Sequence, residues 1–144
     1  HEKNSKEISI ETIQKVSSSL KQNTIFDLQN AVGLKDKTNA LKIAYNLLNN
    51  GAEPVFIVTM LTRYFTAVAK ISELKAKKIP DFKAARSISV HHFYYPGYVK
   101  ASNIFSDKKL IEVFRALLKA DVSIKTTPAG NKEIITILLS EILQ

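Results

Sequence analysis

The stretch at residues 53–78, EPVFIVTMLTRYFTAVAKISELKAKK, constrains the fold more than any other part of the chain. Pro54 marks a helix start, because a proline at the first helical position gives up only an amide that would lack a partner within the helix. Apolar side chains then follow the three- and four-residue spacing of one helix face: Ile57, Met60, Leu61, Tyr64, Phe65, Val68 and Ile71. Further apolar residues widen that face, and a helix of this kind is packed by neighbours on several sides. The pattern predicts a long central helix on which other helices pack.

The composition excludes several protein classes. A length of 144 residues is typical of one domain, and 45% hydrophobic residues are too many for a disordered chain. Four glycines and four prolines are too few for a turn-rich β-sandwich. Without cysteine, the chain has no disulfide and no thiolate metal site. We see no apolar run approaching the roughly 20 residues of a membrane span, and we expect no membrane partner.

The rest of the chain divides into helical segments separated by polar turns. We expect them at residues 25–32, 35–50, 81–88, 96–105, 107–125 and 131–143. Gly33 is expected to end the first of these, and Ser106 and Asn131 to cap the last two. The short connection at 51–53 predicts that the 35–50 helix forms an antiparallel hairpin with the central helix, and the last two helices a second hairpin. The expected fold class is all-α, a bundle of about seven helices.

A domain boundary is expected just before residue 23. Ser17, Ser18 and Ser19 interrupt the apolar pattern, because serine side chains compete for backbone hydrogen bonds. We therefore assign residues 1–22 to a linker or the end of a preceding domain, and 23–144 to the helical domain. The chain opens with His1 and its single methionine is Met60, so we expect it to be a fragment of a longer protein.

The sequence offers no pattern for catalysis or for a cofactor. His91 and His92 are adjacent, and no acidic or histidine partner lies at metal-ligand spacing from them. No glycine-rich phosphate loop or nucleophile motif is present. We therefore expect no catalytic, cofactor or metal site, and no enzyme activity in this fragment.

A nucleic-acid-binding function is the alternative that the charge leaves open. The formal net charge is +8, which suits an acidic partner. The segments 81–88 and 96–105 resemble a degenerate helix-turn-helix in which Lys100, Ser102 and Asn103 would reach a groove. The connection between them is longer than the usual turn and is aromatic. The alternative is thus a stand-alone basic helical domain that binds nucleic acid.

Two polar features lie beside apolar stretches. Asp121 and Lys125 have the four-residue spacing of a surface ion pair, although they could also meet a second subunit. Arg63 lies inside the central helix pattern, where its stem can carry the guanidinium to solvent.

The order of several segments carries a family resemblance. IFDLQNAV is followed by LLNNG, by the central EPVFIVTMLTRYFTAVAKISEL, by YVKAS, by LLKADVSIK and by ILLSEIL. From about residue 24 to 143 this series resembles the C-terminal collar domain of the delta subunit of the bacterial DNA polymerase III clamp loader. Residues 7–16 resemble the last helix of the preceding lid domain. Gly97, close to a helix start, departs from the pattern.

The resemblance implies a non-catalytic oligomerisation role in the bacterial cytoplasm. In that family, five subunits assemble into a ring through such collar domains. The implied partners are clamp-loader subunits of the gamma/tau and delta-prime types, with the sliding clamp bound by the N-terminal region and DNA contacted weakly or indirectly. The family's delta subunit has no working ATP site and no polymerase activity of its own, so no cofactor is implied.

Such a role requires apolar surface beyond that used in the domain's own core. The central and final helices carry more apolar residues than one buried face requires. We expect part of this surplus to form a subunit interface that includes Arg63, Tyr64, Asp121, Lys125, Ile135 and Leu139.

Overall fold

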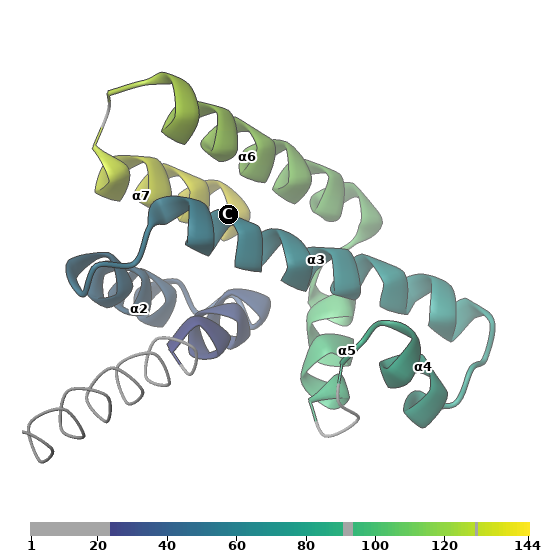
Figure 1. Cartoon of the computed structure of the whole chain (residues 1–144). Helices are drawn as coiled ribbons and strands as arrows, with labels where there is room; N and C mark the ends of the chain where they lie inside the picture. Colours follow the sequence, from purple (N-terminus) through teal and green to yellow (C-terminus); the bar gives the residue numbers. More distant parts are fainter. Residues whose placement is uncertain (1–23, 91–93, 129) are drawn as a thin grey trace, which may run out of the picture.

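The computed structural model of the chain describes residues 24–90, 94–128 and 130–144, and these residues form helices without any strand (Figure 1). Residues 24–33 are helical. The following helices are α2 (Lys37–Asn49), α3 (Pro54–Ala76), α4 (Asp81–Ser87), α5 (Tyr95–Ile104), α6 (Asp107–Thr126) and α7 (Asn131–Ile142). The expected all-α class is confirmed. The proposed boundary before residue 23 and the pair His91 and His92 lie outside the described residues.

The predicted central helix is confirmed as α3, which begins at Pro54. It packs against α5 and α6 and also touches α7, so its neighbours lie on more than one side (Figure 1). Ile57, Leu61, Phe65 and Val68 lose all their exposure to solvent in these contacts. The apolar face that we expected on α3 is therefore the face around which the bundle forms.

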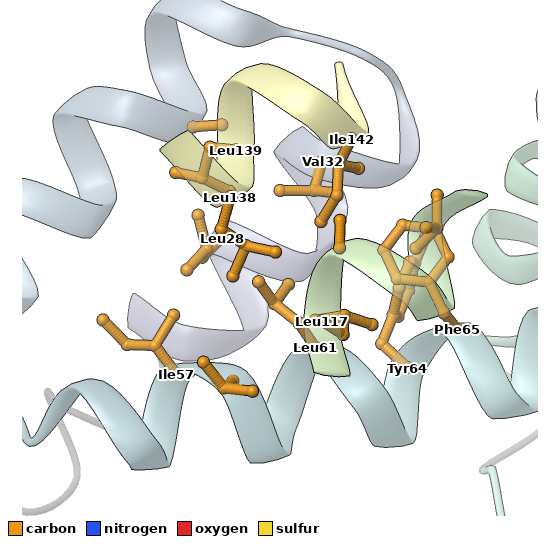
Figure 2. Close-up of a cluster of buried hydrophobic side chains, with 14 of the residues drawn as sticks. Leu28, Val32, Ile57, Leu61, Tyr64, Phe65, Leu117, Leu138, Leu139 and Ile142 are labelled. Atoms are coloured by element: carbon orange, nitrogen blue, oxygen red, sulfur yellow. The ribbon is translucent and has the colours of Figure 1, made fainter. Parts of the chain in front are cut away.

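The main core gathers apolar side chains from helices that are far apart in the sequence. Figure 2 shows them converging: Leu28, Val32, Ile57, Leu61, Leu117, Leu138, Leu139 and Ile142. The first helical segment is also linked to α3 by a hydrogen bond, in which the Gln29 side-chain amide donates to the Met60 carbonyl oxygen at 2.9 Å. Gln29 is the one buried polar residue within the described ranges, and this bond satisfies its amide donor.

The predicted hairpin between α2 and α3 was wrong, because α2 packs on α7 instead. The Tyr45 hydroxyl of α2 lies 2.7 Å from the Thr136 hydroxyl of α7, and the Lys132 ammonium lies 4.6 Å from the centre of the Tyr45 ring. The short connection brings the start of α3 near the end of α2 but does not set the angle between them. The second predicted hairpin, formed by α6 and α7, is confirmed.

A second, smaller core lies at the far end of α3. Ile71 and Leu74 of α3 pack with Ala84 and Ala85 of α4 and with Tyr95 of α5. We call residues 70–90 and 94–106 the distal lobe; Figure 1 shows α4 and α5 grouped around the C-terminal end of α3. The distal lobe is thus held by its own apolar contacts in addition to the main core.

Several helix ends differ in detail from the prediction. Ser106 caps α6 as expected, accepting a hydrogen bond from the Lys109 amide at 3.1 Å. Asn131 is the first residue of α7 rather than its cap, because the cap position is Gly130. The left-handed residue at the end of the first helical segment is Lys35, with φ of 55°, and not Gly33 as expected. The Lys35 amide donates to the Val32 carbonyl oxygen at 3.0 Å, which closes the helix end.

Gly33 is required for close packing. A Cβ atom built on Gly33 would overlap the Tyr64 hydroxyl and approach the Ala101 side chain at 3.3 Å. Tyr64 is buried, and its ring packs against Phe65 and Tyr98 at centroid distances of 5.2 and 4.9 Å. The ring therefore has little freedom to move away, and glycine lets the first helical segment approach α3 and α5.

We expect Gly33→Ala to lower the free energy of unfolding by about 1–3 kcal/mol, since overpacking a filled site costs about that much. The matched control is Gly97→Ala in α5. Among the described residues, a Cβ there meets the Asn30 side-chain oxygen alone, at 4.0 Å. The control should raise the free energy of unfolding by about 0.5–1 kcal/mol, because alanine favours a helix over glycine. Urea denaturation measures both; equal effects of the two substitutions would contradict the packing role.

By length and composition alone, α3 would also be able to cross a membrane, contrary to our expectation that no segment would. It has 23 residues, and its most apolar window has a mean hydropathy of 1.3. Its apolar side chains are the ones that the other helices bury, Ile57 and Phe65 among them. The hydropathy of α3 is accounted for by its place as the core helix.

Candidate subunit interface

An unpaired apolar surface lies along α6. Figure 1 shows α6 along one outer side of the bundle, with α3 and α7 on its inner side. Leu118, Ile111 and Val122 of α6 are 65%, 54% and 50% exposed. They recur at seven and four residues, so that with Arg115 they form one stripe on the side of the helix opposite its buried residues. We call these four residues the α6 outer surface.

A groove between α3 and α6 adjoins this surface. Its volume is about 370 Å³, and it is lined by Val58, Thr59, Thr62 and Arg63 of α3 and by Phe114, Leu117, Leu118 and Asp121 of α6. Two of the predicted interface residues, Arg63 and Asp121, thus line the same groove from different helices. Arg63 is exposed, and it makes no hydrogen bond or ion pair with residues in the described ranges. Its guanidinium is available to a partner's carboxylate or carbonyl groups.

Asp121 and Lys125 form the ion pair that their spacing predicts. The Lys125 ammonium donates to the Asp121 carboxylate at 2.9 Å, and the lysine side chain is well exposed. A solvated pair of this kind adds little to folding stability, about 0.3–0.5 kcal/mol for this spacing. The ordinary interpretation as a surface ion pair is confirmed; a contact with a second subunit stays a prediction.

Three of the predicted interface residues lie in the interior instead. Ile135 and Leu139 are fully buried, and Tyr64 is also buried. Figure 2 shows Leu139 and Tyr64 among the core side chains. They fill the space between α7, α3 and the first helical segment, so their side chains offer no surface to a neighbour. This corrects the selection: the exposed apolar residue of α7 is Ile137, which lines a small groove against α6.

The α6 outer surface was missed because surplus apolar residues were sought on the central and final helices and not on α6 between them. Leu110, Val113 and Leu117 form the buried stripe. Ile111, Leu118 and Val122 fall outside it at helical spacing. A helical projection of α6 alone would have separated the two sets. The α6 outer surface could therefore have been predicted from the sequence.

A second groove, of about 820 Å³, lies between the first helical segment, α3 and the end of α4. Its wall includes Phe26, Met60, Tyr64 and Tyr98. Burial is the main cause that raises the pKa of Tyr64, with a contribution from Tyr98, and burial also raises the pKa of Tyr98. Both phenols therefore stay neutral at physiological pH. Within the described residues, no group of three or more acidic or histidine side chains could hold a metal ion.

Two polar residues of the helix-turn-helix resemblance, Ser102 and Asn103, are held by hydrogen bonds to the end of α3. The Lys75 ammonium at the end of α3 donates to the Ser102 hydroxyl at 3.1 Å and to the Asn103 side-chain oxygen at 2.8 Å. Ser102 also donates to the Val99 carbonyl oxygen at 2.7 Å. Two of the three residues expected to reach a groove are thus bonded within the domain.

The comparisons with known proteins decide the family. The sequence model described as the DNA polymerase III delta subunit, C-terminal domain, matches residues 22–142. The chain belongs to the DNA polymerase III delta-subunit family. It is 25% identical over 129 residues to the DNA polymerase III subunit delta of Bacillus subtilis (strain 168), covering 90% of this chain and 37% of that protein. The resemblance found in the segment order is thereby confirmed.

The fold is also that of a solved family member. The structure of the Bacillus subtilis DNA clamp loader delta protein matches with a TM-score of 0.73 and 22% identity, over 85% of this chain and 36% of that one. The chain spans just over a third of the length of both relatives. The family model that matches residues 22–142 is that of the C-terminal domain, and these residues include the α6 outer surface.

Proposed function

We propose that this domain is the non-catalytic collar of a clamp-loader delta subunit, and that the α6 outer surface binds a neighbouring subunit. The observation that carries the proposal is the stripe of three exposed aliphatic side chains, Ile111, Leu118 and Val122, on one helix. A monomeric domain gains nothing by exposing such a stripe, whereas buried apolar contacts are the usual centre of a subunit interface. Family membership supplies the setting, a DNA polymerase III clamp loader.

The polar residues beside the stripe would set the orientation of the partner. Arg63 and Asp121 line the groove next to Leu118, and Lys125 lies one turn beyond Asp121. Charged groups at the edge of an apolar contact favour correct partners and repel wrong ones more than they add affinity. We expect these three residues at the rim of the interface and the aliphatic stripe at its centre.

The remaining partners follow from the same proposal. In the bacterial cytoplasm the neighbours would be subunits of the gamma/tau and delta-prime types. The sliding clamp would be bound by the part of the longer protein that precedes this domain. A collar of this kind holds its neighbours at a fixed hub while ATP-driven movements occur elsewhere in the assembly, and it performs no chemistry itself.

Light scattering after gel filtration tests the proposal. The chain is analysed alone and then mixed with the gamma/tau-type and delta-prime-type subunits from the same organism. We expect co-elution in a complex of defined stoichiometry, with a mass that includes this chain. Separate elution of the chain at micromolar concentrations of every partner would refute the collar role while leaving the fold unaffected.

A further inference from the structure

One member of the α6 outer surface, Arg115, is charged. It lies between Ile111 and Leu118, its side chain is exposed, and it makes no hydrogen bond or ion pair within the part of the chain that the structure describes. Three lysines of the same helix, by contrast, have polar partners within the domain: Lys109, Lys119 and Lys125. The Arg115 guanidinium is therefore a charge that any partner covering the aliphatic stripe has to accommodate.

The spacing of the α6 outer surface is the same in both directions along the helix. Its members follow one another at four, three and four residues, and they fall within about 60° around the helix axis. A two-fold axis between residues 116 and 117 would thus place α6 of a second copy antiparallel on the first. Ile111 would then lie opposite Val122 of the second copy, and Leu118 opposite its Arg115. Two-fold pairing is the commonest symmetry of protein dimers, and the three aliphatic side chains favour it.

Arg115 opposes that pairing. The two copies of Arg115 would be offset by the rise of three residues, about 4.5 Å along the helix axes. Two guanidinium groups at such a distance repel each other much more strongly in a contact without water than in solution. No carboxylate of α6 or α7 is bonded to Arg115: Glu112 lies 3.5 Å from the Lys109 ammonium, and Glu141 lies 3.1 Å from that of Lys119.

A carboxylate on the covering helix would turn this repulsion into an attraction. The guanidinium of arginine presents a planar set of donors that a carboxylate can accept in two parallel hydrogen bonds. Arg63, in the groove beside Leu118, is a second cation without a polar partner in the described ranges. The surface is thus complementary to a helix that combines an aliphatic stripe with acidic side chains.

We propose that Arg115 sets the specificity of the α6 outer surface. It prevents two copies of this chain from pairing through α6, and it requires an acidic side chain on the aliphatic helix that covers the surface. That helix belongs to the neighbouring subunit, so the second part of the proposal rests on the collar function proposed above, whereas the first part concerns this chain alone. A charge placed in an apolar contact discriminates between partners by penalising the wrong one.

The first measurement is the oligomeric state of the chain alone, by analytical ultracentrifugation up to high micromolar concentrations. The unaltered chain should be monomeric. Arg115→Leu completes an aliphatic stripe of four residues and should form dimers with a dissociation constant of about 10–100 μM, as expected of a small interface. Adding Ile111→Glu to Arg115→Leu should restore the monomer. The matched control is Lys42→Leu, which makes the same change of charge at an exposed lysine of α2 and should stay monomeric.

A mixture of chains with opposite charges at position 115 provides a second measurement. The unaltered chain and the Arg115→Glu variant should each be monomeric, because like charges would meet across the two-fold axis. An equimolar mixture should form mixed dimers, since arginine then lies beside glutamate. These dimers should weaken as salt is added, because salt screens the attraction.

Binding to the neighbouring subunits, by titration calorimetry, tests the second part. Arg115→Glu should bind at least about tenfold more weakly than the unaltered chain, and Arg115→Lys, which keeps the charge, less than about threefold more weakly. Circular dichroism and thermal unfolding confirm that the variants fold, as expected for substitutions at an exposed position.

Each part has its own contrary result. A monomeric Arg115→Leu variant, dimers of the Lys42→Leu control, or an unaltered chain that dimerises equally well would overturn the barrier to self-pairing. Unchanged affinity of Arg115→Glu for the neighbouring subunits would overturn the contact with a carboxylate. If the unaltered chain binds no neighbouring subunit, the collar function is refuted and that contact with it. The measurements on the chain alone distinguish this outcome from a failure of the barrier.

Discussion

The double substitution Ile111→Glu and Leu118→Glu is expected to weaken the binding of this domain to its neighbouring subunits at least about 100-fold. Both side chains are more than half exposed in the isolated domain, so the new carboxylates stay in water and the fold is retained. In an assembled collar the same carboxylates would be buried without partners at the centre of an apolar contact. Losses of 2 kcal/mol or more per central residue are typical of such sites.

The measurement is the dissociation constant of the domain for its partner subunits, by titration calorimetry or analytical ultracentrifugation. Leu34→Glu is the matched control, because Leu34 is also a half-exposed leucine but lies after the first helical segment, outside α6. The control should assemble normally. If the Ile111 and Leu118 variant assembles with unchanged affinity and the Leu34 variant does not, the interface lies on another face of the domain.

The second large effect concerns folding stability. We expect Leu139→Ala to lower the free energy of unfolding by about 2–5 kcal/mol, because Leu139 is fully buried in the main core and alanine would leave a cavity there. Ile137→Ala, two residues earlier on the same helix, should change the free energy of unfolding by less than about 0.5 kcal/mol, because Ile137 is more than half exposed.

Urea denaturation of both variants checks this difference, with the slope of the transition confirming that the unfolding reaction is the same. The comparison also tests the correction made to the interface. If Leu139 contributed to a subunit contact rather than to the core, its substitution would weaken assembly and leave the isolated domain stable. A small effect on unfolding would therefore support the original sequence-based selection.

Resemblance to a known family and helical periodicity predicted different parts of this protein. The order of the segments, from IFDLQNAV to ILLSEIL, indicated the delta-subunit family, which the match over residues 22–142 confirms. Periodicity predicted the long helix α3, and the rule that helices joined by a short connection pack as antiparallel neighbours predicted the α6–α7 hairpin. Of the predicted interface, the polar residues Arg63, Asp121 and Lys125 lie at the surface, where a partner can reach them.

The apolar residues predicted for the interface lie in the interior of the domain for a physical reason. Ile135 and Leu139 belong to a helix with apolar residues on more than one face, so a count of residues cannot tell which face the other helices cover. The role of Gly33 also could not be predicted from the sequence alone. Its position suggested a helix end, whereas its role is to admit the Tyr64 ring.

Features that depend on neighbours in the chain could be predicted without the structure. The start of α3 at Pro54 and the Ser106 cap of α6 arise from backbone hydrogen bonds within a few residues, and local residue types decide these. The packing of α2 on α7 and the exposure of Leu118 arise from competition among several apolar faces for the same interior. That competition is settled only when all the helices pack together, because burying one face leaves another in water.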